Sequence, residues 1–124
     1  MMKENKIAGL ILTFNEEINI VNCIESLKFC NKIVVFDSYS TDKTKELSIT
    51  SGATVFERKF DDYAAQRNAA INSISDEFDW ILMIDADERI DPSLKDEINY
   101  LINSSDSASM YLVRRKDFFL NTWL

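Results

Sequence analysis

The sequence predicts an α/β fold, with a mostly parallel sheet covered by helices on both faces. Short apolar runs of strand length alternate along the chain with segments of helical periodicity, which indicates successive strand–helix units. The apolar runs show little polar alternation, which is typical of strands buried on both faces. Polar residues follow several of these runs directly. In such sheets ligands bind beyond the carboxyl ends of the strands, so we expect a site there.

Turn and capping residues divide the chain into elements. We expect Asn15 to cap a helix that continues to about residue 29, and Gly52 to end a second helix. Asp91 caps a fourth helix that begins at Pro92. The predicted strands cover residues 7–13, 32–37, 53–57, 80–85 and, in a more exposed setting, 109–114. The predicted helices cover residues 15–29, 41–51, 61–74 and 92–103, and a polar loop covers 104–109.

Composition limits the classes of function. With 124 residues the chain is expected to form a single domain, residues 1–124. Hydrophobic residues make up 46% and charged residues 28%, as in an ordinary globular protein. The net charge of −7, with no basic stripe, argues against a nucleic-acid partner. Histidine is absent, so any metal site must use oxygen ligands.

Other features concern the cellular setting. Cys23 and Cys30 are expected to be small core residues rather than a disulfide, which fits a reducing cytoplasm. The apolar run 7–12 is too short for a signal peptide, and no run approaches the roughly 18 residues of a membrane span. We expect a cytoplasmic protein. Attachment to a membrane surface, as a peripheral protein of the inner membrane, is left open.

An acidic cluster follows the strongest apolar run. Asp85, Asp87 and Glu88 come directly after Ile81–Ile84. Asp85 and Asp87 are two residues apart, so in extended backbone they point the same way. Two such carboxylates repel each other unless a cation or a hydrogen-bond network lies between them. Mg²⁺ or Mn²⁺, held by one or two carboxylates and a phosphate-bearing ligand, fits this pattern; an acidic turn that caps the next helix is the alternative.

The turn after the first strand reads Thr13-Phe14-Asn15-Glu16-Glu17 and lacks the glycines of a dinucleotide-binding loop. Its acids would repel a bare phosphate, so the turn suits neutral groups such as a base or a ribose. The same acids also favour a helix N-terminus.

Two further positions are candidates for ligand contact. Asp37 ends the second strand and could accept a hydrogen bond from a base or sugar, or could simply form a side-chain turn. In the third helix, spacing places Arg67 on an apolar stripe with Asn68 beside it. A buried guanidinium needs a partner, which is either a structural carboxylate or a diphosphate.

Four motifs together resemble family 2 glycosyltransferases of the GT-A fold, closest to the bacterial lipopolysaccharide core β-glucosyltransferase group. The likeness spans nearly the whole chain, with the motifs in the family's order. The matching segments are Leu12-Thr-Phe-Asn-Glu-Glu17, Val34-Val-Phe-Asp-Ser-x-Ser-x-Asp-x-Thr44, Tyr63-Ala-Ala-Gln-Arg-Asn68 and Ile84-Asp-Ala-Asp-Glu88.

The resemblance implies a nucleotide-sugar donor, usually UDP-linked, and transfer with inversion to the hydroxyl of a glycan or lipid-linked glycan. It places Thr13, Asn15 and Glu16 in the nucleoside pocket. It places Asp37 at the base, with Arg67 and Asn68 on the nucleotide side. Asp85 would hold the ribose or a metal-bound water, and Asp87 would bind Mg²⁺ or Mn²⁺ at the diphosphate.

The family's general base lies in a later segment, and no acid of this sequence matches its motif position. We therefore expect a donor-binding part of an enzyme, with a non-catalytic nucleotide-sugar-binding module as the alternative. A phosphoryl-transfer enzyme of the haloacid dehalogenase type is a weaker option, because Arg89 replaces the Thr or Val of that motif. The apolar residues of 118–124 are expected to pack on further structure or to promote self-association.

Overall fold

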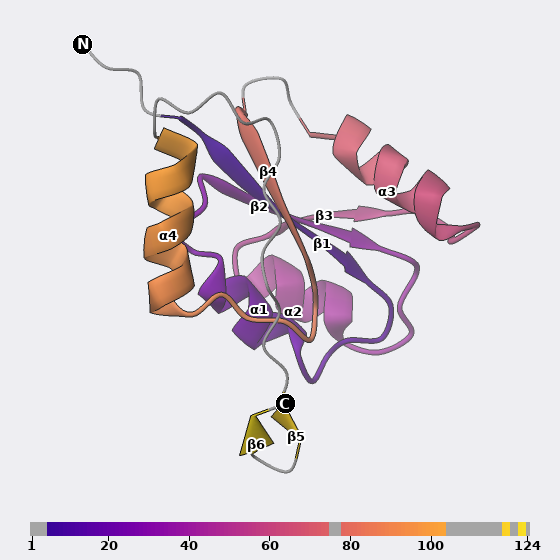
Figure 1. Cartoon of the computed structure of the whole chain (residues 1–124). Helices are drawn as coiled ribbons and strands as arrows, with labels where there is room; N and C mark the ends of the chain where they lie inside the picture. The colour runs from indigo at the N-terminus through magenta and orange to yellow at the C-terminus, as the bar shows by residue number, and fades with distance from the viewer. Residues whose placement is uncertain (1–4, 75–77, 104–117, 120–121, 124) are drawn as a thin grey trace.

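A four-stranded, all-parallel sheet forms the centre of the protein, in the order β3–β2–β1–β4 (Figure 1). The computed structural model describes residues 5–74, 78–103, 118–119 and 122–123. The strands of this sheet are β1 (Ile7–Thr13), β2 (Lys32–Asp37), β3 (Thr54–Glu57) and β4 (Trp80–Asp85). Two short strands, β5 (Phe118–Phe119) and β6 (Thr122–Trp123), pair antiparallel with each other. The predicted fold class is confirmed.

Helices cover both faces of the sheet (Figure 1). They are α1 (Ile20–Ser26), α2 (Thr44–Thr50), α3 (Tyr63–Asn72) and α4 (Pro92–Asn103). Within the described part of the chain, no helix is both long and apolar enough to cross a bilayer.

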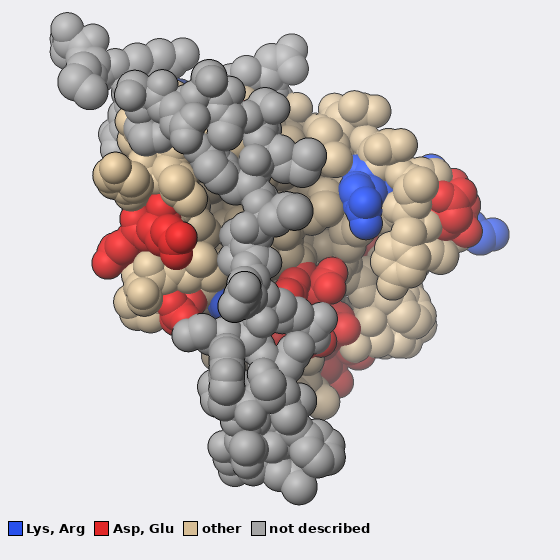
Figure 2. All heavy atoms as spheres, in the orientation of Figure 1, with Lys and Arg blue, Asp and Glu red and all other residues tan. Residues whose placement is uncertain are grey.

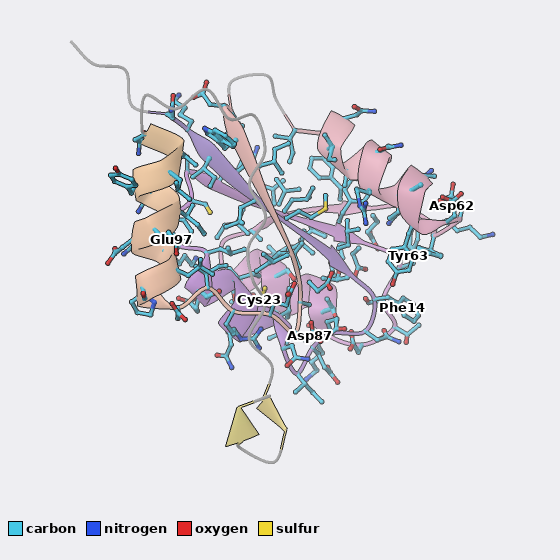
Figure 3. All side chains as sticks on the ribbon, in the orientation of Figure 1. Phe14, Cys23, Asp62, Tyr63, Asp87 and Glu97 are labelled. Carbon is cyan, nitrogen blue, oxygen red and sulfur yellow. The ribbon has the colours of Figure 1, made fainter. Side chains whose placement is uncertain are left out.

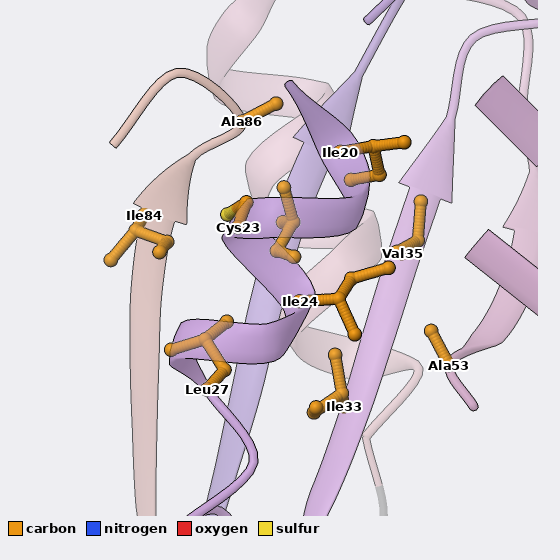
Figure 4. Packing of buried hydrophobic residues seen from close by; sticks show 10 residues of the cluster. Ile20, Cys23, Ile24, Leu27, Ile33, Val35, Ala53, Ile84 and Ala86 are labelled. Carbon is orange, nitrogen blue, oxygen red and sulfur yellow. The ribbon is translucent and has the colours of Figure 1, made fainter. Parts of the chain in front are cut away.

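The larger core lies between α1 and one face of the sheet (Figure 4). There Ile24 and Leu27 pack with Ile11 and Val35, all four fully buried. Gly9 permits this close approach, because a Cβ at that position would lie 3.1 Å from Leu27 Cδ1. Cys23 belongs to this core and Cys30 is half-buried beside it, both as free thiols, as predicted.

The opposite face is covered by α3, where Ala70 packs on Leu10, Val34 and Phe36. A third cluster packs Ile98 and Ile102 of α4 against Ile7. Successive side chains along β1 thus point to opposite faces of the sheet, and each face is closed by its own helices.

The first helix is shorter than predicted. Asn15 is not its N-cap: Asn19 precedes α1, and Glu16 and Glu17 lie before the helix. Asn15 instead adopts a left-handed φ of 52°, and the backbone N–H groups of residues 15–17 bond to side chains of the next loop. A residue with this left-handed φ is not part of a right-handed helix, so Asn15 lies outside α1, which starts at Ile20.

Other boundaries differ by a few residues. The second helix starts at Thr44 rather than 41, and the third covers Tyr63–Asn72 with Asp62 as its N-cap, accepting from Ala65 N–H at 2.8 Å. Gly52, at φ 100°, follows the second helix as predicted. Asp91 caps α4 as predicted, accepting from Leu94 N–H at 2.7 Å.

One strand is less buried than its sequence suggests. In β4 only Ile84 is buried and Ile81 is exposed, because β4 is an edge of the sheet among the described strands. The predicted loop 104–109 and strand 109–114 lie outside the described residues.

Candidate functional site

The strand register aligns the polar strand ends. Thr13 lies opposite Asp37 in the β1–β2 pair, and Leu12 lies opposite Asp85 in the β1–β4 pair. Glu57 lies opposite Asp37 in the β2–β3 pair. The polar residues that follow different strands are therefore gathered along one edge of the sheet, as predicted.

A pocket of about 530 Å³ opens at this edge. Its wall combines acidic residues at the end of β4, a basic residue on α3 and three aromatic rings. The lining residues are Leu12, Thr13, Phe14, Glu16, Ser38, Phe60, Tyr63, Gln66, Arg67, Asp85, Ala86 and Asp87. In Figure 2, acidic side chains lie near the end of the sheet and a basic side chain lies across a hollow, toward α3. Figure 3 shows Phe14, Tyr63 and Asp87 at this same end of the molecule.

The turn after β4 presents two carboxylates to solvent. Asp85 and Asp87 are exposed, whereas Ala86 between them is 2% exposed and packs in the α1 core. The two acids therefore project away from the core while the residue between them anchors the turn. No hydrogen bond or ion pair of the Asp85 or Asp87 carboxylate is found among the described residues.

Neighbouring side chains hold this turn in shape. The Glu88 carboxylate accepts from Asp85 N–H at 2.7 Å, and Glu88 N–H donates to Asp85 C=O at 3.0 Å. Arg89 Nη1 donates to the carbonyls of Ala86 and Glu88, each at 2.7 Å. Glu88 and Arg89 thus satisfy the backbone of the turn and leave Asp85 and Asp87 available to a ligand.

Cys23 supports the turn from the core side. Its Sγ lies 3.7 Å from the Asp85 carbonyl oxygen. Burial raises the pKa of the Cys23 thiol to about 12, an effect that Arg89 opposes and the neighbouring acids reinforce. Burial alone raises the pKa of Cys30 to about 12. Both thiols are therefore protonated and unreactive at neutral pH.

The loops after β1 and β2 are joined by a set of hydrogen bonds that we call the loop clamp, between residues 13–17 and 37–44. Asn15 Oδ1 accepts from Thr41 N–H at 2.8 Å, and Asn15 N–H donates to Ser40 Oγ at 2.8 Å. Glu16 N–H donates to Thr44 Oγ1 at 2.8 Å. These backbone donors are occupied, so the turn offers no free N–H cradle to a phosphate, consistent with its lack of glycine.

Asp37 lies at the centre of the clamp. Its side chain is fully buried and accepts from Thr13 Oγ1 at 2.7 Å, from Ser40 N–H at 2.8 Å and from Ser40 Oγ at 2.6 Å. The side-chain turn foreseen as an alternative is thus present. A contact of Asp37 with a base stays a prediction.

Arg67 does not lie on a core-facing stripe, and that prediction is wrong. Arg67 and Tyr63 are exposed, and the buried residues of α3 are Gln66 and Ala70. The buried face of α3 is shifted by about one residue from the predicted face, so that the polar residue Gln66 is buried and Arg67 is not. Arg67 has no hydrogen-bond or salt-bridge partner within the described residues, and it faces the pocket.

Of the predicted site residues, the pocket brings together Thr13, Glu16, Arg67, Asp85 and Asp87. Asn15, Asp37 and Asn68 do not line it; the first two build the loop clamp, and Asn68 is exposed.

Several lining residues were not predicted to be functional. Phe60 and Tyr63 contact each other edge to face, with ring centroids 5.4 Å apart. Gln66 is 1% exposed and donates to Ser38 Oγ at 3.0 Å. In the sequence, Ser38 belongs to a turn and Gln66 precedes the charged residue Arg67. Nothing near either residue in the sequence predicts that Ser38 lines a pocket or that Gln66 is buried.

A cation could be held at Asp85 and Asp87, provided that a ligand completes its coordination. Among the described residues, no group of three or more Cys, Asp or Glu side chains is arranged to hold a metal alone. Two exposed carboxylates without protein partners supply hard oxygen ligands, and Mg²⁺ in particular is commonly bound by one or two carboxylates plus substrate phosphates. The residues present therefore fit a metal shared with an anionic ligand.

The parallel sheet with a pocket at the carboxyl ends of its strands is the arrangement in which open α/β domains bind their ligands. The model of glycosyl transferase family 2 matches residues 10–123. The chain belongs to this family.

Curated relatives agree with this assignment. An uncharacterized glycosyltransferase of Rickettsia typhi is 38% identical over 108 residues, which cover 86% of this chain and 36% of the relative. The lipopolysaccharide core biosynthesis glycosyltransferase LpsC of Rhizobium meliloti is 33% identical over 125 residues, which cover 97% of this chain and 46% of LpsC. The chain therefore spans between about a third and a half of the length of these relatives.

Solved structures show the same fold. Glucosyl-3-phosphoglycerate synthase of Mycobacterium tuberculosis in complex with UDP superposes with a TM-score of 0.60 at 25% identity, covering 68% of this chain and 34% of that one. The same enzyme with Mn²⁺, UDP and glucosyl-3-phosphoglycerate gives a TM-score of 0.59 at 24% identity, covering 66% and 33%. These enzymes have the GT-A fold.

Proposed function

We propose that this chain is the donor-binding part of an inverting glycosyltransferase that takes a UDP-sugar together with Mg²⁺ or Mn²⁺. The observation that carries the proposal is the distribution of unpaired charge in the pocket. Asp85 and Asp87 lie on one wall and Arg67 lies on α3, and none of the three has a charged partner in the described structure.

A diphosphate bridged to a divalent ion satisfies both sides of this arrangement. The ion would neutralise the repulsion between the two carboxylates, and a diphosphate oxygen could accept from the Arg67 guanidinium. When bound, the ion would act as a Lewis acid that stabilises charge on the departing UDP. The fold neighbours named above were crystallised with UDP and with Mn²⁺ or Mg²⁺, which supports this choice of ligand and ion.

The nucleoside would occupy the side of the pocket formed by Thr13, Phe14 and Glu16, where the loop clamp fixes the backbone before any ligand arrives. Fixed polar groups lose little freedom on binding, so they contribute to affinity and orientation. Phe14 is 57% exposed there and offers a flat apolar surface. We also propose that Asp37, which is buried next to this wall, and Asn68, which is exposed on α3, contribute to binding of the nucleotide.

The acceptor is proposed to be a hydroxyl of a lipopolysaccharide or another cell-surface glycan, free or lipid-linked. The name of LpsC supports this class of acceptor. An inverting transfer needs a general base on that hydroxyl. We place the base outside residues 1–124, because no acid of this sequence matches the family's motif position and the Glu88 carboxylate is already bonded to the Asp85 N–H.

The setting proposed for this reaction is the cytoplasmic side of the inner membrane, with the protein peripheral to it. The apolar residues of 118–124 are proposed to contact further structure or a second copy of the chain.

Calorimetric titration with UDP, with and without Mn²⁺, tests the donor-binding proposal. We expect binding that requires Mn²⁺, and we expect Asp87→Ala to weaken it by at least about 100-fold, since loss of one partner of a desolvated charge pair costs several kcal/mol. Glu97→Ala is the matched control, because it removes an exposed acid on α4, away from the pocket (Figure 3). Absence of UDP binding with Mn²⁺ present, or unchanged binding in Asp87→Ala, would contradict the proposal.

The second candidate is a nucleotide-sugar-binding module without turnover, because the acids that line the pocket among the described residues, Glu16, Asp85 and Asp87, are all proposed to hold the donor or its ion. It predicts the same binding isotherms but no release of sugar from a UDP-sugar. A hydrolysis assay that detects free sugar, absent in Asp87→Ala, separates the two candidates.

A further inference from the structure

A buried amide forms part of the pocket wall. Gln66 is 1% exposed, which is unusual for a polar side chain and requires hydrogen-bond partners. Its Oε1 accepts from Arg58 Nη1 at 2.7 Å, and its Nε2 donates to Ser38 Oγ at 3.0 Å. The amide therefore links the loop before α3 with the loop after β2.

The orientation of this amide is fixed by chemistry. A guanidinium has only donors, so the oxygen of Gln66 must face Arg58 and the nitrogen must face Ser38. Arg58 is itself held in place by Asp61, which accepts from Nη1 at 2.8 Å and from Nη2 at 2.9 Å. The hydrogen bonds from Arg58 lower the pKa of Asp61 well below its usual range, so the Asp61–Arg58 pair is ionised at neutral pH.

The amide leaves Ser38 with a free proton. A serine hydroxyl has one O–H donor, and its oxygen here accepts from Gln66. No acceptor for the Ser38 O–H is found in the part of the chain that the structure describes. Ser38 is half-buried and lines the pocket, so its O–H is available to a ligand that carries an acceptor.

The position of Ser38 separates it from the acids. Ser38 follows β2, whereas Asp85 ends β4, and β1 lies between these two strands. Neighbouring strands are about 4.8 Å apart, so the two strand ends are separated by roughly 10 Å. A ligand whose diphosphate lies at Asp85 and Asp87 would therefore bring its far end, the base, to Ser38.

We propose that Ser38 donates a hydrogen bond to O4 of the nucleobase and thereby selects uracil over cytosine, and that Gln66 is the positioning residue that keeps the Ser38 proton free. Uracil has an acceptor at O4, where cytosine has the N4 amino donor. The inference rests on the proposed function, since it names the specificity of the same donor pocket.

Exchange of the amide for a carboxylate tests this arrangement with almost no change in shape. In Gln66→Glu, both carboxylate oxygens are acceptors, so one still accepts from Arg58 while the other accepts the Ser38 O–H. Ser38 would then present lone pairs instead of a proton to the pocket. The ratio of the UDP and CDP dissociation constants, measured with Mn²⁺ by calorimetry, isolates this effect, because any added repulsion acts on both diphosphates alike.

We expect the wild-type chain to favour UDP over CDP by about 3- to 10-fold, the value of one neutral hydrogen bond. Gln66→Glu should abolish or reverse this preference, and Ser38→Ala should bring the ratio to about 1 without Gln66 being changed. Ser38→Ala keeps the proposal testable if Gln66→Glu fails to fold.

Two outcomes would overturn the proposal in different ways. If both variants bind Mn²⁺–UDP with the wild-type ratio, Ser38 does not read the base, while the proposed function stands. If the wild-type chain binds neither UDP nor CDP, the specificity proposal and the proposed function both fail.

Discussion

The two sides of the pocket differ in how far the protein satisfies its own polar groups. On the β1–β2 side, the buried Asp37 carboxylate and the N–H groups of Asn15 and Glu16 all have side-chain or backbone partners. On the β4–α3 side, the carboxylates of Asp85 and Asp87 and the guanidinium of Arg67 have none among the described residues.

This difference separates residues that hold the pocket in shape from residues that are proposed to bind a ligand. A buried charge without partners is costly, so Asp37 must be satisfied for the chain to fold. Exposed charges are solvated and need no partner for stability. Unpaired charges of opposite sign in one pocket are therefore available to an ion and an anion. The β1–β2 side, whose polar groups are hydrogen-bonded, is the fixed part of the pocket beside them.

The largest effect is expected at the Cys23 thiol, which contacts the backbone of the Asp85–Asp87 turn on the β4–α3 side of the pocket. At pH 8, native Cys23 should react with a disulfide reagent about a thousandfold more slowly than in urea, because burial raises its pKa from 9.0 to about 12. Cys30→Ser isolates the Cys23 signal. Fast labelling of the native variant would show that the Asp85–Asp87 turn opens readily.

The same pKa shift has a consequence for stability. Since the folded-state pKa of Cys23 lies above that of the unfolded chain, the folded state retains the proton between about pH 9 and pH 12. Its contribution is complete below pH 9 and is lost as the pH rises through that window. Urea midpoints should therefore fall above pH 9, and less so in Cys23→Ala than in the parent protein.

Removal of the buried acid on the satisfied side should be the most damaging substitution for stability. Asp37→Ala removes the acceptor of three hydrogen bonds and leaves Thr13 Oγ1 and Ser40 N–H unpaired, so we expect a loss of about 3 kcal/mol. Urea denaturation measures this loss. A destabilisation under about 1 kcal/mol would mean that the clamp is not needed for folding.

Asn15 separates backbone conformation from side-chain bonding within the clamp. In Asn15→Ala the Thr41 N–H loses its acceptor, and alanine tolerates a φ of 52° less well than asparagine does. We therefore expect the free energy of unfolding to fall by about 1–2 kcal/mol. Asn15→Gly keeps the conformation free of strain, so it should cost less than Asn15→Ala. Equal costs in thermal or urea unfolding would assign the whole effect to the side-chain bond.

The smallest effect on stability is expected on the open side. Asp87→Ala should change the free energy of unfolding by less than about 0.5 kcal/mol, since Asp87 is exposed and no hydrogen bond to its carboxylate is found in the described structure. A clear stabilisation by Asp87→Ala would indicate repulsion between Asp85 and Asp87 in the free protein. A clear destabilisation would show that Asp87 takes part in interactions that stabilise the fold.

The alternation of strands and helices along the chain and the gathering of polar strand ends could be predicted from the sequence, because apolar runs and helical periodicity are local signals. The alignment of Thr13, Asp37 and Asp85 follows directly from parallel pairing. Gly52 and Pro92 were equally informative, since each restricts its own backbone.

The interior of the site could not be predicted in the same way. The role of Asn15 depends on Ser40 and Thr41, about 25 residues away, which no local pattern connects. The rotation of α3 depends on Gln66, whose burial is favourable only because Arg58 and Ser38 supply partners. Long-range hydrogen bonds thus decided which of the polar residues line the pocket.

The most direct test of the central claim is the affinity for Mn²⁺, measured by electron paramagnetic resonance with and without UDP. If the two carboxylates and the diphosphate share one ion, Mn²⁺ binding should be weak alone and stronger by 10-fold or more with UDP, and UDP affinity must rise by the same factor with Mn²⁺. The gain should vanish in Asp87→Ala. Mn²⁺ affinity that is the same with and without UDP would contradict the account.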